Sequence, residues 1–177
     1  MPAIVNPTPG SPSMPPTMDK SSLPQQVLAR LADDLLQTEH AARTAHEMAT
    51  HEENIAENKY DTLGLEASYL ATGQARRAEA IREAMAHWRQ FHPRPYDASQ
   101  GIQLGALVCL VASDDLQQLL FLGPRGGSMS LAIGDAHVQV ISGESPLGAA
   151  MLGKFVGDEV SMQVGPTRQQ FEVLWAL

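Results

Sequence analysis

The sequence predicts an α+β protein in two parts: an antiparallel coiled-coil helical hairpin at the amino end, followed by a small antiparallel β domain with one short helix. The hairpin is indicated by apolar and small residues that recur at steps of three and four within residues 19–92. The β domain is indicated by short apolar runs that alternate with polar residues over 101–177. A length of 177 residues allows one ordinary domain or two small ones.

The composition excludes several classes of protein. The chain has 12 basic and 20 acidic residues, a formal charge of −8, whereas a general nucleic-acid binder usually needs a basic face. The single cysteine, Cys109, rules out a disulfide framework and a Cys-rich zinc site, and it fits a reducing cytosol. The sequence has no apolar run long enough to span a membrane and no secretory signal pattern. We therefore expect a cytoplasmic protein that does not bind membranes.

Residues 1–18 differ in composition from the rest of the chain, because they hold six of the 12 prolines and no charged side chain. Such a segment cannot bury a core, so we expect a disordered or polyproline-like tail of little function. The first helix is expected directly after it, since Ser22 can cap a helix and Pro24 suits the first helical turn.

Two long helices are expected between residues 22 and 92, with a break near residues 53–57. The predicted apolar seam consists of Leu28, Leu31, Leu35, Thr38, Ala42, Ala45 and Ala49 on the first helix, and of Tyr60, Leu63, Ala67, Leu70, Gln74, Arg77, Ile81, Ala84, Trp88 and Phe91 on the second. Helices of about 30 to 34 residues would be roughly 50 Å long, since each residue adds about 1.5 Å. The hairpin is therefore expected to act as an arm rather than as a container.

The carboxyl part begins after a linker at residues 93–100, where two prolines stop the second helix. The strands we expect are Leu104–Val111, Leu116–Leu122, His137–Ile141, Val160–Val164 and Phe171–Leu177. Turn residues separate them at Asp114-Asp115 and at residues 123–127. Ser145 as a cap and Pro146 at the first helical position predict one short helix over residues 145–152.

Most candidate catalytic and metal-binding patterns fail on spacing. His46 and His51 are five residues apart, so their rings lie about 140° apart around a helix and cannot share a zinc ion as those of a His-Glu-x-x-His motif do. Ser145 does not lie in a Gly-x-Ser-x-Gly motif, and Pro146 removes a backbone donor there. The Gly126-Gly127 pair is not followed by the lysine of a phosphate-binding loop. Cys109 lies in an apolar run and is expected in the core.

Acidic residues gather around the break between the two helices. They are Glu47, Glu52, Glu53, Glu57, Asp61 and Glu66, with Lys59 as the only base among them. One interpretation is a solvated acidic turn, which is common in proteins. The other is a functional tip, because Mg²⁺ prefers carboxylate oxygens and usually takes only one or two from a given protein. A group of carboxylates at the end of a long arm could add such a ligand to a metal site inside another protein.

Two stretches of the chain resemble the Gre transcript cleavage factors. Ile55-Ala56-Glu57-Asn58-Lys59-Tyr60, followed by a long helix, is similar to the tip of these factors, whose pattern is Asp-x-x-Glu-Asn-x-x-Tyr. The segment from Ser145-Pro146-Leu147-Gly148 to Gly157-Asp158-Glu159-Val160 is similar to their carboxyl-domain signature, which opens with Ser-Pro-Leu-Gly and ends with Gly-Asp-x-Val. The stretches come in the family's order, and the resemblance covers residues 19–177.

This resemblance implies a carboxyl domain of the FK506-binding-protein-like type and binding at the rim of the secondary channel of bacterial RNA polymerase. The arm would enter the channel, and the carboxylates of Glu53 and Glu57 would help to hold the second Mg²⁺ of the polymerase and a water molecule against backtracked RNA. The chain would then be an accessory factor without a cofactor of its own, and not an enzyme. It would meet the nascent RNA and the DNA template only indirectly.

The resemblance also assigns roles to further residues. Asn54, Asn58 and Tyr60 would support the tip, and Glu144, Ser145 and Pro146 would contact the polymerase rim. The residues that would contact RNA form a sparse basic set: Arg43, Lys59, Arg76 and Arg77.

One departure from the family pattern bears on activity. The tip aspartate of the family falls on Asn54, and a neutral amide is a much poorer Mg²⁺ ligand than a carboxylate. Glu53 could substitute if the tip loop shifts by one residue, and Tyr60 follows Asn58 one residue sooner than in the family pattern.

Three other hypotheses stay open. The first is a regulator that binds the secondary channel without promoting RNA cleavage. The second is a prolyl isomerase, since the implied carboxyl fold is shared with those enzymes. The third is a coiled-coil dimerisation module, whereas a hairpin that satisfies its own seam would be a monomer.

Overall fold

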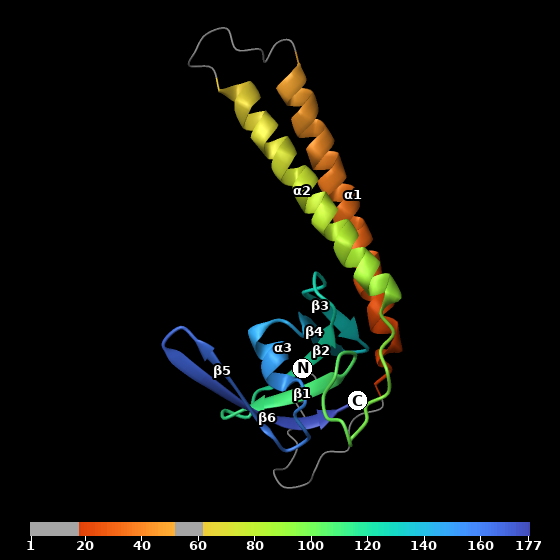
Figure 1. Ribbon diagram of the computed structural model, residues 1–177, viewed down its shortest axis with the longest axis vertical. Coiled ribbons are helices and arrows are strands. Elements are labelled where there is room, and N and C mark those ends of the chain that lie inside the picture. Colours follow the sequence, from red (N-terminus) through yellow and green to blue (C-terminus); the bar gives the residue numbers. More distant parts are fainter. Residues whose placement is uncertain (1–17, 52–61) are drawn as a thin grey trace, which may run out of the picture.

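The computed structural model describes residues 18–51 and 62–177, and it has two parts (Figure 1). Two long helices, α1 (Leu23–Thr50) and α2 (Leu63–Gln90), form an arm that rises from a six-stranded sheet. The strands are β1 (Leu107–Ala112), β2 (Gln117–Gly123), β3 (Met129–Ile133), β4 (Ala136–Ser142), β5 (Glu159–Val164) and β6 (Thr167–Ala176). A short helix, α3 (Pro146–Met151), follows β4 as predicted. Residues 1–17 of the predicted tail and the predicted break at residues 53–57 lie outside the described residues.

The start of the arm follows local capping rules, although the cap differs from the prediction. The backbone N–H of Ser21 donates to Oδ1 of Asp19 (2.9 Å), so Asp19 caps a single 3-10 turn, η1 (Lys20–Ser22), that leads into α1. Ser22 holds the N-cap position of α1 without a side-chain cap bond, and Pro24 lies in the first turn as predicted. Each helix has 28 residues and is about 42 Å long, shorter than expected. None of the described helices is long and apolar enough to cross a membrane.

The seam between the two helices follows the prediction on α1 and follows it only in part on α2. The predicted residues of α1 are all buried or half-buried, and the hydroxyl of Thr38 is satisfied by the carbonyl oxygen of the preceding turn (2.7 Å). On α2 the seam uses Ala71 and Ala78, and three predicted seam residues are exposed instead: Leu63, Leu70 and Arg77. Both registers satisfy a 3-4 spacing, so the large side chain at position 70 misled the prediction.

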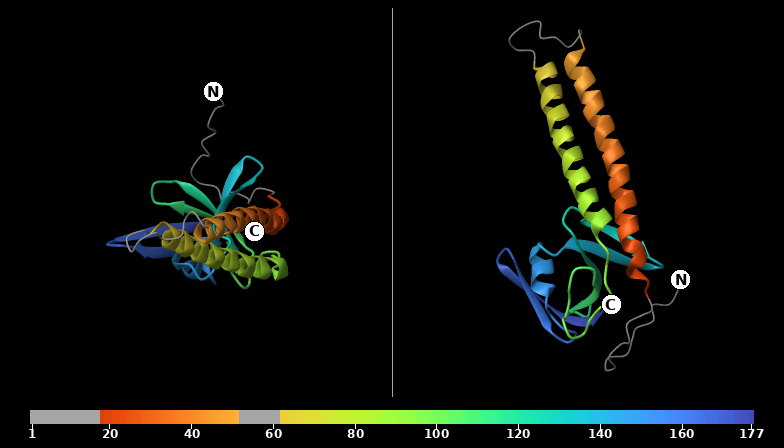
Figure 2. Two further views of the ribbon diagram at one scale, coloured as in Figure 1. Left: turned by 90° about the horizontal axis from the view of Figure 1, so that it is seen from above. Right: turned by 45° about the vertical axis from the view of Figure 1, so that its right-hand side comes forward.

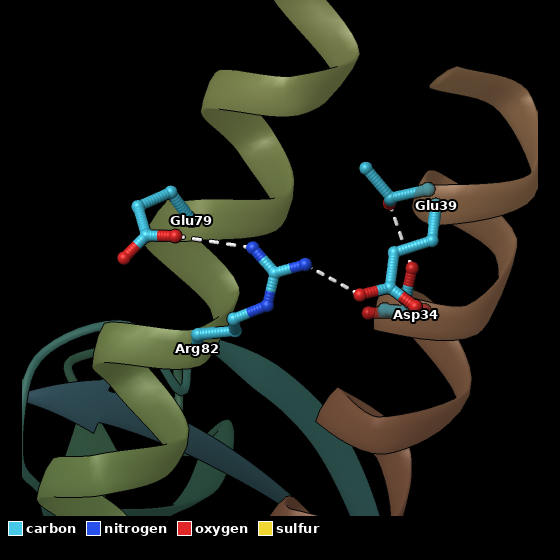
Figure 3. A network of polar contacts seen from close by, with 5 residues as sticks. Asp34, Glu39, Glu79 and Arg82 are labelled. Carbon is cyan, nitrogen blue, oxygen red and sulfur yellow. Dashed lines mark hydrogen bonds and ion pairs between the residues drawn. The ribbon is translucent and has the colours of Figure 1, made fainter. Parts of the chain in front are cut away.

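A polar link crosses the arm near its middle (Figure 3). The guanidinium of Arg82 on α2 donates to the carboxylate of Glu39 on α1 and to that of Glu79 on its own helix (3.0 Å). Glu39, and then Glu79, raise the pKa of Arg82. Because all three side chains are exposed to water, the attraction is screened and adds little stability. The link favours one alignment of α1 beside α2.

The sheet has the strand order β3-β4-β2-β1-β6-β5 and is mixed, whereas we predicted an antiparallel sheet. β2 and β4 run parallel, and the other neighbouring pairs are antiparallel. The prediction failed because it missed β3, which adds one reversal of the chain before β4. The alternation of Met129, Leu131 and Ile133 and the Gly134-Asp135 turn were the signals for this strand. The FK506-binding-protein-like assignment stays a prediction.

The arm and the sheet share an apolar core. The base of the arm covers one face of the sheet, as the views in Figure 2 show. The buried residues of this face are Leu23, Val27, Leu31, Ala84, Met85 and Trp88 from the arm, with Leu107, Cys109, Phe121, Val138, Val140 and Trp175 from the sheet. On the other face, Val108 and Leu110 of β1 pack with Met151 of α3. Successive residues of β1 therefore serve opposite faces, as alternation in a strand requires.

Candidate functional site

The predicted site has two regions, the tip of the arm and a loop of the sheet domain. The tip, which we define as residues 52–61, lies outside the described residues. The predicted tip residues are Glu53, Asn54, Glu57, Asn58, Lys59 and Tyr60. The structure describes the helix ends that flank them, where Glu47 and Glu66 are both exposed. Within residues 18–51 and 62–177, no group of three or more His, Cys, Asp or Glu side chains could hold a metal ion.

The loop of the sheet domain is built around Ser145, the N-cap of α3. Its hydroxyl donates to the carbonyl oxygen of Ser142 (2.6 Å) and accepts from the backbone N–H of Gly148 (3.1 Å). Pro146 occupies the first turn of α3 and is exposed. The predicted cap and helix start are therefore confirmed. Because both roles of the hydroxyl are taken within the loop, Ser145 organises the loop, and Glu144 and Pro146 are the residues presented to solvent.

Gly148 explains why this loop needs a glycine on the first turn of its helix. A Cβ atom at position 148 would lie 2.1 Å from the carbonyl oxygen of Ser142 and 2.9 Å from Oγ of Ser145. Those are the two oxygen atoms of the cap itself. Any side chain at this position would push the cap apart, so the Ser-Pro-Leu-Gly segment is a structural unit.

A second loop lies beside the first and was not predicted as part of the site. Arg125, from the turn between β2 and β3, forms an ion pair with Glu144 (3.0 Å), and both side chains are about two thirds exposed. A cleft of about 170 Å³ separates the two loops and is lined partly by Leu104 and Leu152. These leucines are exposed at 46% and 40%. Spacing alone could not have found them, because Leu104 was assigned to a strand that in fact begins at Leu107.

Three of the predicted RNA-contacting residues lie on the two helices of the arm. Arg43 lies on α1, and Arg76 and Arg77 lie on α2, where successive residues point about 100° apart around the helix. All three side chains are exposed. Lys59, the remaining predicted member of this set, lies outside the described residues.

The glycines of the turn at residues 123–127 are explained by packing against the arm. Cβ atoms at Gly123 and Gly127 would lie 2.2 Å and 2.4 Å from atoms of the Trp88 ring. A Cβ at Gly126 would lie 2.4 Å from that of Ala84. The turn is thus a cradle for the end of α2.

Cys109 is buried in the core under the base of the arm, as expected. Burial raises the pKa of its thiol to about 11, so the reactive thiolate is disfavoured. This environment is that of a packed core side chain rather than of a nucleophile.

The comparisons with known proteins bear on the sheet domain. The family described as "Transcription elongation factor, GreA/GreB, C-term" matches residues 100–176. None of the curated proteins compared with the chain matches it.

Several solved structures are similar at low identity. GreA factor homolog 1 (Gfh1) of Thermus thermophilus is 21% identical over 85% of this chain and 94% of its own, with a TM-score of 0.36. Gfh1 of Thermus aquaticus is 21% identical over 84% of this chain and 92% of its own, with a TM-score of 0.38. A transcription elongation factor GreA/GreB from Nitrosomonas europaea is 16% identical over 55% of this chain and 78% of its own, with a TM-score of 0.35.

These TM-scores are too low to support an assignment, so the assignment depends on the family match. That match covers the whole sheet domain, including the Ser145–Gly148 cap and the cradle for Trp88. Residues 100–176, which make up the sheet domain, therefore match the carboxyl-terminal domain of GreA/GreB transcription elongation factors.

Proposed function

We propose that this chain is an accessory factor of bacterial RNA polymerase that inserts its arm into the secondary channel and stimulates cleavage of backtracked RNA. The observation that carries the proposal is the combination of a GreA/GreB carboxyl-terminal domain with a helical arm about 42 Å long. An arm of this length is slender, because α1 and α2 share a single seam and no third helix covers them along the described outer half.

The loop at residues 144–146 is the proposed contact with the polymerase rim. Its geometry supports this role because the cap of Ser145 and the contact of Gly148 hold Glu144 and Pro146 at the surface. A preformed loop loses little conformational freedom on binding, which favours affinity.

The tip carboxylates of Glu53 and Glu57 are the proposed source of chemistry. In metal-assisted hydrolysis, one ion activates water and the other steadies the leaving oxygen, so a carboxylate that improves Mg²⁺ binding raises the rate. The chain supplies that ligand to the active site of the polymerase and is not itself the enzyme. Mg²⁺ belongs to the polymerase.

The experiment measures the rate of RNA cleavage in a stalled, backtracked polymerase complex with Mg²⁺, with and without the protein. E53A/E57A should lower the stimulated rate by about 10- to 100-fold, the range seen when supports of a metal ligand are removed. E47A is the matched control, since it removes an exposed carboxylate from the last turn of α1. Full activity of E53A/E57A, or no stimulation by the wild type, would contradict the cleavage proposal.

A second function is favoured by Asn54, which stands where the family has an aspartate. A chain with one tip carboxylate fewer could occupy the channel and regulate transcription without promoting cleavage. N54D distinguishes the two functions. If the wild type binds polymerase without stimulating cleavage and N54D gains the activity, the chain is a non-cleaving regulator.

The rim contact is tested separately, by affinity for polymerase. E144A and P146A should weaken binding without lowering thermal stability, because both side chains are exposed. S145A is unsuitable alone, since loss of its cap costs about 1 kcal/mol of stability. L116A is the control, as it truncates an exposed leucine of the sheet domain in the turn before β2.

A further inference from the structure

Lys20 lies at the point where the arm joins the sheet domain. Its ammonium donates three hydrogen bonds to backbone carbonyl oxygens: Arg94 (2.8 Å), Gly105 (2.8 Å) and Leu177 (2.7 Å). Arg94 belongs to the linker after α2, Gly105 precedes β1, and Leu177 follows β6. One side chain at the start of the arm thus joins three segments that are 74, 85 and 157 residues away in sequence.

The chemistry of these bonds suits a lysine. An ammonium group has three N–H donors and no acceptor, so the three carbonyl oxygens use its full capacity. Burial lowers the pKa of Lys20 to about 8, which still leaves the group mainly charged at pH 7. A neutral side chain of similar length would leave three carbonyl oxygens without this partner.

The Lys20 bonds border open space at the junction. An open cleft of about 500 Å³ lies here, between the residues at the start of the arm, the linker and the end of β6. Its lining includes Pro93, Pro95, Tyr96, Ala176 and Leu177. The other attachment of the arm is apolar, and both helices contribute to it, with Leu23 and Val27 from α1 and Trp88 from α2. The Lys20 bonds add a polar attachment that reaches the linker and the end of the sheet directly.

We propose that Lys20 is a positioning residue that fixes the direction of the arm relative to the sheet domain. It does so by tying the start of α1 to the linker, to the residue before β1 and to the end of the sheet at the same time. The consequence for polymerase rests on the proposed function: with the arm fixed, the tip and the loop at residues 144–146 can meet their partners together.

The test measures the direction of the arm in the free protein. Spin labels at Glu47→Cys on α1 and Leu116→Cys before β2 report the distance between arm and sheet, and buried Cys109 stays unlabelled. The wild-type background should give one narrow distance distribution. K20M should give a distribution at least twice as broad, or a second distance. K154M is the matched control, since it removes a lysine charge elsewhere in the sheet domain and should keep the narrow distribution.

A further variant separates positioning from lost stability. V27A removes buried apolar contacts at the base but leaves all three Lys20 bonds, so it should lower the melting temperature and keep the narrow distribution. A narrow distribution in K20M would overturn the proposal, and so would equal broadening in V27A and K20M at matched stability.

Chemical rescue tests the ammonium itself. K20C alkylated with 2-bromoethylamine regains an ammonium at nearly the reach of lysine, and it should restore the wild-type small-angle scattering curve. Alkylation with 2-bromoethanol adds a similar chain without charge and should not restore it. Equal rescue by both reagents would overturn the proposal. Because these measurements need no polymerase, a failure to bind polymerase would remove the proposed function and leave this inference intact.

Discussion

The base of the arm, where residues 23–31 and 84–88 pack on the sheet, is built from different side chains than the outer part, which comprises the rest of both helices. At the base, Leu23, Val27 and Trp88 are fully buried between the two helices and the sheet. In the outer part, alanines line the seam, while Leu65 and Tyr69 are exposed at 54% and 70%. Burying one large apolar side chain stabilises a protein by about 1.5–3 kcal/mol, whereas alanine contributes mainly helix propensity. The arm is therefore anchored by packing at one end and held by local helix preference at the other.

The largest expected effect that tests this contrast is the loss of the Trp88 side chain. W88A should lower the free energy of unfolding by about 3–5 kcal/mol, as is typical when a buried aromatic residue becomes alanine. L65A, at the outer part, should change it by less than about 0.5 kcal/mol, because surface substitutions rarely do more. Denaturant unfolding followed by circular dichroism measures both values. Similar losses in W88A and L65A would show that the base is not the anchor.

Trp88 also permits a finer variant. Its Nε1 is buried and has no hydrogen-bond partner among the described residues. W88F keeps most of the packing and removes this unsatisfied donor, so it should recover most of the stability lost in W88A. A W88F as unstable as W88A would point to a hidden partner for the indole nitrogen.

The contrast between base and outer arm was only partly predictable from the sequence. The 3-4 spacing gave both helices, the alternating runs gave five of the strands, and Ser145-Pro146 gave the start of α3. The spacing could not choose between Leu70 and Ala71 for the seam, because the two registers differ by one residue. It also could not show that Trp88 packs on the sheet as well, since that packing depends on glycines at positions 123 and 127, far along the chain.

The next largest effect on stability is expected from a glycine-to-alanine substitution, which we compare at the base and in the outer part of the arm. G127A places a Cβ 2.4 Å from the ring of Trp88 and should cost about 1–3 kcal/mol through overpacking. G73A, in the outer part of α2, has open space around its Cβ and should stabilise the protein by about 0.5–1 kcal/mol. Thermal unfolding shows the sign of each change. A G127A protein as stable as the wild type would mean that the cradle can widen, and the base would then be less tightly packed than its geometry indicates.

The candidate site was predictable where it depends on local rules and not where it depends on contacts between loops. The Ser145 cap follows from the Ser-Pro sequence, and the structure confirms it. The ion pair between Arg125 and Glu144 joins turns 19 residues apart and left no pattern in the sequence. The contacts of Lys20 were not predictable either, because its three acceptors are backbone atoms, which a pattern of side chains does not reveal.

The smallest expected effect is a pH dependence of stability that comes from Cys109, which lies under the base of the arm. Because burial raises the thiol pKa from 9.0 to about 11, the folded state keeps a proton that the unfolded state loses between these pH values. Its contribution to stability is therefore complete below pH 9 and is lost as the pH rises through 11. The difference in unfolding free energy between wild type and C109A should fall over this range, and a constant difference would contradict the assignment.

The same thiol distinguishes the two regions kinetically at neutral pH. Cys109 lies on the face of the sheet that the base of the arm covers, so a thiol reagent reaches it only when the base lifts or the domain unfolds. W88A should therefore speed the reaction strongly. L65A should leave the rate unchanged, because loosening the outer part of the arm does not uncover the sheet. If L65A speeds the reaction as much as W88A does, the arm opens as one unit, and the division into an anchored base and a separately held outer part is wrong.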